Sequence, residues 1–318
     1  MDATTRAQFE KWTATGQPNL RDAPALGYGA LMAHAAFVRP ERTVAIFDAL
    51  AHATAASADP ATRADWLEAA LPFTMSESTA DPAGRSVPAA LWDAFWAVTG
   101  TAPGSSGSID PLAFTITVVA MGIHYDQTLI DRCEATLMAF DNVRRLLAEP
   151  EVRMRTADLA GKPADSLGTE LLTMLTANGY DLEVIDPDAV VLPGAYPAQN
   201  RTNRRILQLH DVWHLVGGYG FTGAGEIAIS GFQLAQFGQN YSTRFLATVQ
   251  TMAVLHMEPM AETILTVILD GWRHGRETPD LLAVPWHHKL DRPIRALRDE
   301  LGVTPFDSPV ARIMEAAK

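Results

Sequence analysis

The sequence predicts an all-α fold, a multi-helix bundle-like domain with one loop-rich segment near residues 184–200. Apolar residues recur at helical spacing along most of the chain, as in RTVAIFDALAHATAA at residues 42–56. Residue types that favour helix starts and helix ends bound several of these stretches. Three prolines between residues 186 and 200 interrupt the pattern and predict a loop there.

The N-terminal elements follow from these start and stop signals. Asp59 and Pro60 form a cap-plus-proline start for a helix over residues 61–71. Val87-Pro88 precedes a second apolar stretch, which ends at Gly100. Residues 101–110 (TAPGSSGSID) are rich in small and turn-forming residues, which predicts a flexible connector.

The remaining elements are also predicted to be helical. Residues 111–149 are first apolar and then amphipathic. Asp165 or Ser166 can cap a helix over 167–178 that ends at Gly179. Val184-Ile185 and residues 190–192 are a candidate short β-hairpin, and helices are expected again from residue 201 to the end of the chain.

The domain organisation is expected to be an N-terminal helical region, residues 1–139, and a core, residues 140–318, packed together as one compact domain. A chain of 318 residues with 47% hydrophobic and 19% charged residues can bury a large core. Apolar helical spacing on both sides of the 101–110 connector predicts that residues 57–139 pack onto the core.

Composition excludes several classes of protein. The net charge of −12 argues against a nucleic-acid-binding surface. The single cysteine, Cys133, excludes a disulfide framework and a CxxC metal site. The longest apolar run, residues 111–123, is shorter than the roughly 20 residues that a membrane span needs. The N-terminus lacks a signal-peptide layout, so a cytoplasmic protein is expected.

The most informative motif is HDVWH at residues 210–214, followed by eleven residues and then Glu226. Histidines four apart on a helix lie on one face, and Asp211 is a helical neighbour of His214. The glycine-rich passage after the helix can fold back and present Glu226 to His210 and His214. Imidazole and carboxylate without thiolate suit a divalent metal, with zinc expected first and manganese, iron, cobalt or magnesium as alternatives.

This passage has two other interpretations besides a metal site. Two histidines at helical spacing are often only a hydrogen-bonded surface pair. The same passage also spells GxGxxG at residues 218–223, but no strand precedes it, so no dinucleotide cofactor is expected.

Several motifs in the same order resemble the Coq-four family of ubiquinone (coenzyme Q) biosynthesis proteins. The resemblance is good over residues 201–303, plausible over 140–200 and not visible over 57–139. The residues that carry it are HDxxH-x11-E at 210–226, Gly225-Glu226-Ile227-Ala228, Trp272-Arg273-His274-Gly275, the stretch from Trp286 to Pro293 and LRDELGV at 297–303.

The resemblance implies a function. It implies work on the ring of a polyprenylated benzoate, with C1 decarboxylation and hydroxylation, at the membrane periphery and together with other ubiquinone-biosynthesis proteins. His210, His214, Glu226 and Asp211 would hold the metal, although Asp211 could instead orient a histidine. Glu226 and Asp211 are the expected catalytic residues. A polyprenylated aromatic or isoprenoid lipid is the expected ligand, and a homodimer is an open alternative.

The sequence departs from the family pattern beside the motif. Ser230 stands where the family usually has lysine, and Gln233 stands where it usually has glutamate. A neutral serine cannot pair with a carboxylate as a lysine could. These changes bear on which headgroup the site accepts.

Two other functions remain open on the sequence alone. One is a non-catalytic isoprenoid-binding scaffold in which the metal only holds helices together. The other is a metal-dependent hydrolase, because HDxxH superficially resembles HExxH. In each lipid-binding interpretation, an apolar cavity is expected beside the motif, with Ile227, Phe232, Leu234 and Phe237 in its wall.

Overall fold

The computed structural model describes residues 2–71, 87–102 and 111–316. Over these ranges it confirms the all-α prediction, because it contains helices and no strand; one isolated β-bridge joins Ser166 to Pro293. The first helices along the chain are α1 (Ala3–Thr15), α2 (Pro24–Phe37), α3 (Thr43–Ala56), α4 (Pro60–Ala70), α6 (Ala89–Thr99), α7 (Pro111–Ala120), α8 (Gln127–Met138) and α9 (Asp141–Ala148). The later helices are α10 (Leu167–Asn178), α11 (Pro197–Gly217), α12 (Gly223–Phe237), α13 (Asn240–His256), α14 (Ala261–Glu277), α15 (Ile294–Leu301) and α16 (Pro309–Ala316).

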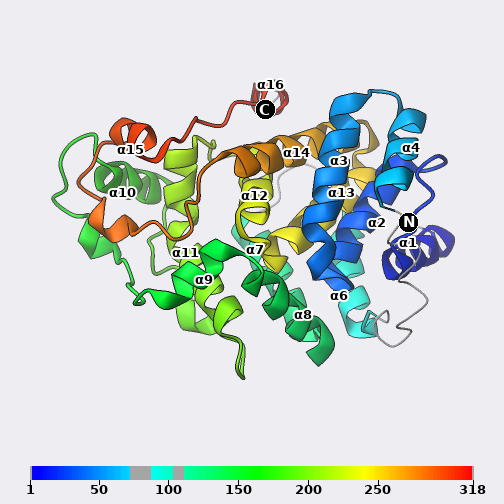
Figure 1. The fold of residues 1–318 in the computed structure, drawn as a ribbon, viewed down its shortest axis with the longest axis horizontal. Helices are drawn as coiled ribbons and strands as arrows, with labels where there is room; N and C mark the ends of the chain where they lie inside the picture. The colour runs from blue at the N-terminus through cyan, green and yellow to red at the C-terminus, as the bar shows by residue number, and fades with distance from the viewer. Residues whose placement is uncertain (1, 72–86, 103–110, 317–318) are drawn as a thin grey trace.

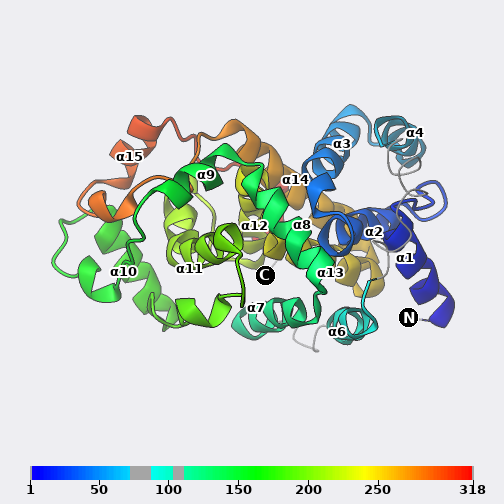
Figure 2. The same cartoon turned by 60° about the horizontal axis from the view of Figure 1, so that its bottom comes forward.

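The helices form an elongated body (Figure 1). The N-terminal helices α1 to α4 gather at one end, and α10 and α15 lie at the other (Figure 1). Helices α12, α13 and α14 lie between the two ends, and Figure 2 shows the same order after rotation. The region that connects the two ends is therefore built from these helices of the C-terminal half, with α7 and α8 beside them.

The N-terminal region packs directly on this central layer. Helix α2 is buried along nearly its whole length, and the side-chain amide of Asn240 in α13 donates to the carbonyl of Ala36 at 2.9 Å. The indole of Trp272 in α14 donates to Asp48 in α3 at 2.9 Å. An aromatic cluster joins α1, α2 and α6, with members Phe9, Phe37, Trp92, Phe95 and Trp96. Residues 2–71 and 87–102 thus share one core with the C-terminal helices.

The expected helix boundaries are largely confirmed. Asp59 caps α4, and Ser166, rather than Asp165, caps α10 by accepting from the amide of Thr169. Gly179 ends α10 with a positive φ of 75°, a conformation that glycine adopts without steric cost. Residues 103–110 of the expected connector lie outside the described residues.

Two expectations differ from the structure. The hairpin prediction was wrong, because Pro187–Val190 forms a 3-10 helix, which Asp186 caps. The loop over 186–200 ends early, because Pro197 occupies the first turn of α11, where a missing N–H costs nothing. The stretch 111–149 is helical, as expected, and is divided where Tyr125 and Asp126 turn extended and Asp126 caps α8. Within the described ranges, no helix combines the length and the apolar character needed to cross a membrane.

The approach of α12 to α14 fixes the position of the motif. A Cβ on Gly231 of α12 would lie 2.4 Å from the carbonyl oxygen of Ile268, and one on Gly271 of α14 would lie 2.0 Å from that of Ala228. Real side chains do not fit at such distances, so the two helices pack backbone against backbone. This contact holds α12 rigidly, and α12 carries Glu226 in its first turn.

Candidate metal centre

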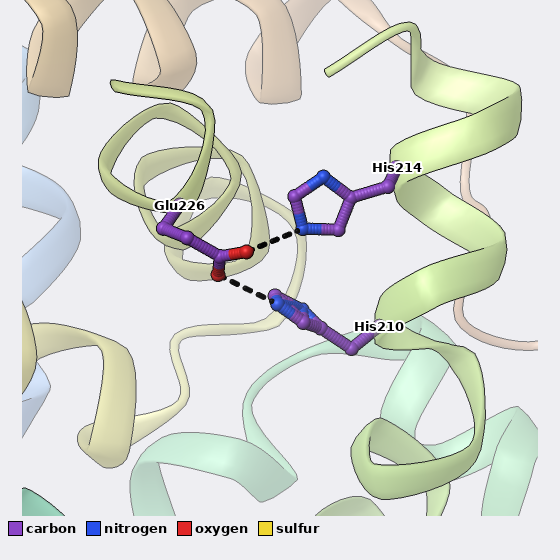
Figure 3. A group of neighbouring side chains, drawn as sticks. All are labelled: His210, His214 and Glu226. Atoms are coloured by element: carbon purple, nitrogen blue, oxygen red, sulfur yellow. Dashed lines mark hydrogen bonds and ion pairs between the residues drawn. The ribbon is translucent and has the colours of Figure 1, made fainter. Parts of the chain in front are cut away.

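Helices α11 and α12 bring His210, His214 and Glu226 together, as expected from the sequence (Figure 3). The two imidazoles project from one face of α11 with ring centroids 4.7 Å apart. The carboxylate of Glu226 lies opposite, with Oε2 at 3.1 Å from Nε2 of His210 and Oε1 at 3.2 Å from Nε2 of His214. One ligand atom from each residue lies within 4.8 Å of the others. We refer to these three residues as the HHE cluster.

The return of the chain from α11 to α12 depends on local backbone chemistry. Gly218 ends α11 with a φ of 81°. Thr222 caps α12 by accepting from the amide of Gly225 at 3.0 Å. A Cβ on Gly225 would lie 1.8 Å from the carbonyl oxygen of Gly220, so only glycine permits this loop. The glycines of the motif therefore serve the turn and place Glu226 beside the histidines.

The LRDELGV stretch at residues 297–303 stabilises the end of α11. The guanidinium of Arg298 in α15 donates to the carbonyls of Leu215 and Val216 at 2.7 and 2.9 Å. These are carbonyls of the last turn, which lack partners within the helix. The LRDELGV stretch thus acts on the site indirectly, by holding the helix that carries both histidines.

His214 is oriented for metal binding. Its Nδ1 donates to the carbonyl of Tyr219 at 3.3 Å, which leaves a lone pair on Nε2 of the neutral ring. That Nε2 is buried, points toward the Glu226 carboxylate, and has no hydrogen-bond partner among the described residues. A lone pair that faces a carboxylate is unfavourable unless a cation lies between them. The HHE cluster therefore fits a divalent metal with nitrogen and oxygen ligands.

The HHE cluster is open on one side. The side chain of His214 is fully buried, whereas those of His210 and Glu226 are 28% and 34% exposed. Phe221 stacks on the His214 ring with centroids 4.2 Å apart, so it covers the closed side. A metal held by three residues with one open side leaves a coordination position for a substrate, which is typical of catalytic sites.

The electrostatic surroundings favour the protonation states that bind metal. Burial by itself would raise the pKa of Glu226, but His214 and His210 outweigh burial and lower that pKa. Burial and the adjacent His214 lower the pKa of His210. The cluster thus tends toward a carboxylate and a neutral His210 imidazole, which are the forms that ligate a metal.

The other residues singled out beside the motif lie apart from the three ligands. Asp211 is not in the HHE cluster; it is partly buried, and burial raises its pKa. Ser230 points back along its own helix and donates to the carbonyl of Glu226 at 2.8 Å. Gln233 does approach the cluster, with its amide nitrogen 3.4 Å from Nδ1 of His210.

The apolar side chains of α12 are buried, as expected, but they contact core residues. Ile227, Phe232, Leu234 and Phe237 are each at most 8% exposed. Phe232 packs against Tyr219, and Phe237 packs against Trp213. The lipid cavity expected beside them stays a prediction.

Tyr219 was missed at the level of sequence. Its carbonyl fixes the tautomer of His214, and its hydroxyl contacts Nδ1 of His274 at 2.5 Å. His274 in turn donates from Nε2 to the carbonyl of Thr304 at 2.7 Å. A backbone carbonyl carries no residue-specific signal, so only the five-residue spacing from His214 hints at this role.

Comparison with known proteins places these features in a family. The family model described as coenzyme Q (ubiquinone) biosynthesis protein Coq4 matches residues 106–307. This range includes the HHE cluster and also residues 106–139, for which no resemblance was visible in the sequence. The match extends beyond the motif through α7, α8 and α9.

Individual relatives agree with the family model. The chain is 28% identical over 186 residues to the mitochondrial ubiquinone biosynthesis protein COQ4 of Zygosaccharomyces rouxii, spanning 56% of this chain and 53% of the relative. It is 25% identical over 238 residues to the mitochondrial COQ4 homolog of Trypanosoma brucei brucei, covering 70% of this chain and 87% of that protein. The chain thus matches about half the length of the yeast relative. The names of these relatives give no support to the expected cytoplasmic location.

A solved structure shares the fold. It is a crystal structure of a Nostoc punctiforme protein provisionally named as a ubiquinone biosynthesis protein, with a TM-score of 0.52 and 23% identity. The superposition covers 67% of this chain and 97% of that chain. The family model itself spans well over half of the 318 residues, so the chain belongs to the Coq4 family of coenzyme Q (ubiquinone) biosynthesis proteins.

Proposed function

We propose that this protein acts in ubiquinone biosynthesis as a metal-dependent enzyme on the ring of a polyprenylated benzoate. The reaction removes the C1 carboxylate as carbon dioxide and introduces a hydroxyl at the same carbon. This change removes two electrons from the ring, so an oxidant of the dioxygen class must accept them. Family membership supports the pathway, and the geometry of the HHE cluster supports the metal.

One observation carries the proposal more than any other. The buried Nε2 of His214 faces the Glu226 carboxylate without a hydrogen bond, while Nδ1 of the same ring is held by the Tyr219 carbonyl. His210, His214 and Glu226 would hold the metal, and a bound divalent metal supplies a Lewis acid for the substrate carboxylate or phenolate oxygen. Zinc is the first expectation for this ligand set, and manganese, iron, cobalt and magnesium fit the same donor atoms.

The chain's own residues divide the remaining tasks. The partly exposed sides of His210 and Glu226 leave room for the polar head of a substrate. The buried His214 ring and the Phe221 ring stacked on it exclude water from the opposite side. Asp211, whose pKa is raised by burial, is a candidate for holding a proton close to the reacting head. Apolar contacts would bind the isoprenoid tail, at roughly 0.8 kcal/mol for each buried CH₂.

The proposal separates binding from turnover. In Glu226→Gln, the carboxylate ligand is lost, so turnover of a polyprenylated benzoate with dioxygen should fall below detection. The tail contacts are unchanged, so the lipid dissociation constant should stay within about threefold of the wild type. Isothermal titration and product analysis by mass spectrometry measure the two quantities.

The control is Glu300→Gln, an exposed carboxylate that pairs with Lys289 far from the motif in sequence. It should retain both turnover and lipid binding. Loss of lipid binding together with turnover in Glu226→Gln would instead indicate a scaffold whose metal only holds the fold. Hydrolysis of an ester or peptide by the metal-loaded wild type, without decarboxylation, would replace the proposal with the hydrolase alternative.

A further inference from the structure

A buried chain of polar side chains leads away from His210. Gln233 in α12 is 2% exposed, and its Nε2 lies 3.4 Å from Nδ1 of His210. The fully buried Ser242 in α13 donates from Oγ to Oε1 of Gln233 at 3.2 Å. The same hydroxyl lies 3.3 Å from Oε1 of Gln239, whose Nε2 donates to Asn203 at 3.1 Å. Buried polar groups in such a chain each need a partner.

In this arrangement, the chain fixes the proton of His210 on Nε2. With the Gln233 amide turned so that its N–H faces Nδ1, the amide donates to Nδ1, and Nδ1 is the acceptor nitrogen of the neutral ring. The ring proton is then on Nε2, where it donates to Oε2 of Glu226 at 3.1 Å. This tautomer cannot bind a metal through Nε2.

Metal binding through the HHE cluster requires the other tautomer. Nε2 of His210 is the nitrogen that faces Glu226, so it must offer its lone pair to the metal. The imidazole then loses its proton from Nε2, gains one on Nδ1 and stays neutral. The new Nδ1–H faces Gln233, which must present an acceptor in place of its N–H.

Gln233 and Ser242 can meet this requirement without leaving their places. A half-turn of the amide places Oε1 toward His210 and the NH₂ group toward Ser242. Oε1 then accepts from Nδ1–H, and the NH₂ group donates to the serine oxygen. The serine hydroxyl turns its proton to Oε1 of Gln239, which already lies within hydrogen-bond distance. Every donor in the chain again has an acceptor.

We propose that Gln233 and Ser242 form a reversible hydrogen-bond relay that lets His210 change from donating to Glu226 to binding a metal. The inference rests on the proposed metal function of the HHE cluster. Gln233 is a positioning residue, because it acts through His210 and not on the substrate. An amide suits the role because it carries a donor and an acceptor of nearly the same shape. A purely structural glutamine would satisfy its neighbours equally well but would leave the metal affinity unchanged when replaced.

The test compares zinc affinities of four proteins by competition with a chromogenic chelator. Gln233→Met removes the acceptor for Nδ1–H and should weaken zinc binding by roughly 10–100-fold. Gln233→Glu keeps an acceptor at that place, so its zinc affinity should return to that of the wild type or exceed it. The matched control is Gln236→Met, because Gln236 is also buried in α12 but bonds to the carbonyls of Gly275 and Thr278 and not to a histidine. It should lower the unfolding temperature and leave the zinc affinity unchanged.

A second measurement follows the proton itself. Long-range proton–nitrogen spectra of histidine-labelled protein should show the His210 proton on Nε2 without metal and on Nδ1 with zinc. Zinc binding by Gln233→Met as tight as by the wild type would overturn the relay, as would the same His210 tautomer in both forms. Either result would leave the proposed function standing. Failure of the wild type to bind any divalent metal would contradict the proposed function itself.

Discussion

Two histidines, one in α2 and one in α11, are both buried and both bonded through Nδ1 to a backbone carbonyl, but they differ in what the second ring nitrogen faces. His34 in α2 is 5% exposed and donates from Nδ1 to the carbonyl of Thr13 at 2.7 Å. His214 in α11 is 1% exposed and donates from Nδ1 to the carbonyl of Tyr219 at 3.3 Å. In both rings, the backbone carbonyl fixes the tautomer and leaves Nε2 as the free nitrogen.

The surroundings of Nε2 separate a structural histidine from a candidate ligand. The His34 ring lies against the backbone at Gly16, where a Cβ would come within 3.1 Å of the ring, and no carboxylate among the described residues forms an ion pair with it. His214 instead faces Glu226, with His210 beside it. Burial and a fixed tautomer are therefore not enough to indicate a metal site. The convergence of a second imidazole and a carboxylate is the distinguishing feature.

The largest effect that should separate the two histidines is acid destabilisation at His34. Burial lowers the pKa of His34 from 6.5 to about 4. Below pH 6.5, the unfolded chain binds a proton that the folded protein does not bind, so stability falls as the pH drops from about 6.5 to about 4. At 1.36 kcal/mol per pKa unit, the loss is about 3 kcal/mol. Urea unfolding between pH 4 and 7.5 measures it.

The variant that checks this prediction is His34→Asn, which keeps an N–H for the Thr13 carbonyl but cannot titrate. Its free energy of unfolding should depend less on pH over this range by about the same 3 kcal/mol. The exposed His52→Asn is the control and should retain the wild-type slope. Zinc affinity should be unchanged in both variants. An unaltered acid slope in His34→Asn would show that another group causes the destabilisation.

A smaller effect should appear at the HHE cluster, and its sign is the opposite of that expected for a structural contact. At pH 8 and without metal, the lone pair of His214 Nε2 faces a carboxylate. The amide of the Glu226→Gln variant can donate an N–H to that lone pair. The amide oxygen of the variant can still accept from Nε2–H of His210. We therefore expect the metal-free variant to gain about 1 kcal/mol of stability, or about 1.5 °C in Tm by scanning calorimetry.

Adding zinc should distinguish the wild type from the Glu226→Gln variant further. Saturating zinc should raise the Tm of the wild type, because a ligand that binds only the folded state stabilises it, and should have little effect on the variant. Residues that form a binding site commonly lower the stability of the protein when the ligand is absent. A metal-free variant that is less stable than the wild type would mean that the contact of the Glu226 carboxylate with His210 outweighs its unfavourable contact with the lone pair of His214.

The sequence predicts those elements that depend on interactions between residues close together in the chain. Cap residues such as Asp59 and Ser166 and end residues such as Gly179 act within one turn, so their pattern predicts the helix boundaries. The HHE cluster was also predictable, because α11 spaces two histidines by one turn and a fixed loop returns Glu226. The false hairpin near Val190 arose because short apolar runs do not distinguish a strand from a 3-10 turn.

Features that depend on tertiary contacts could not be predicted from the sequence. Gly271 looks like an ordinary helical glycine until the carbonyl of Ala228 is seen 2.0 Å from where its Cβ would lie. Gln233 was noted only as a departure from the family pattern, and its contact with His210 requires the packing of α11 against α12. Tyr219 acts on His214 through a backbone carbonyl, which every residue possesses.

The most direct test of the account is the metal content of the protein after zinc loading and gel filtration, measured by elemental mass spectrometry beside circular dichroism. The account predicts one zinc per wild-type chain. It predicts loss of that zinc in the His210→Ala/His214→Ala double variant, with the helical signal retained. Undiminished zinc in the double variant would contradict the claim that His210, His214 and Glu226 form the metal centre.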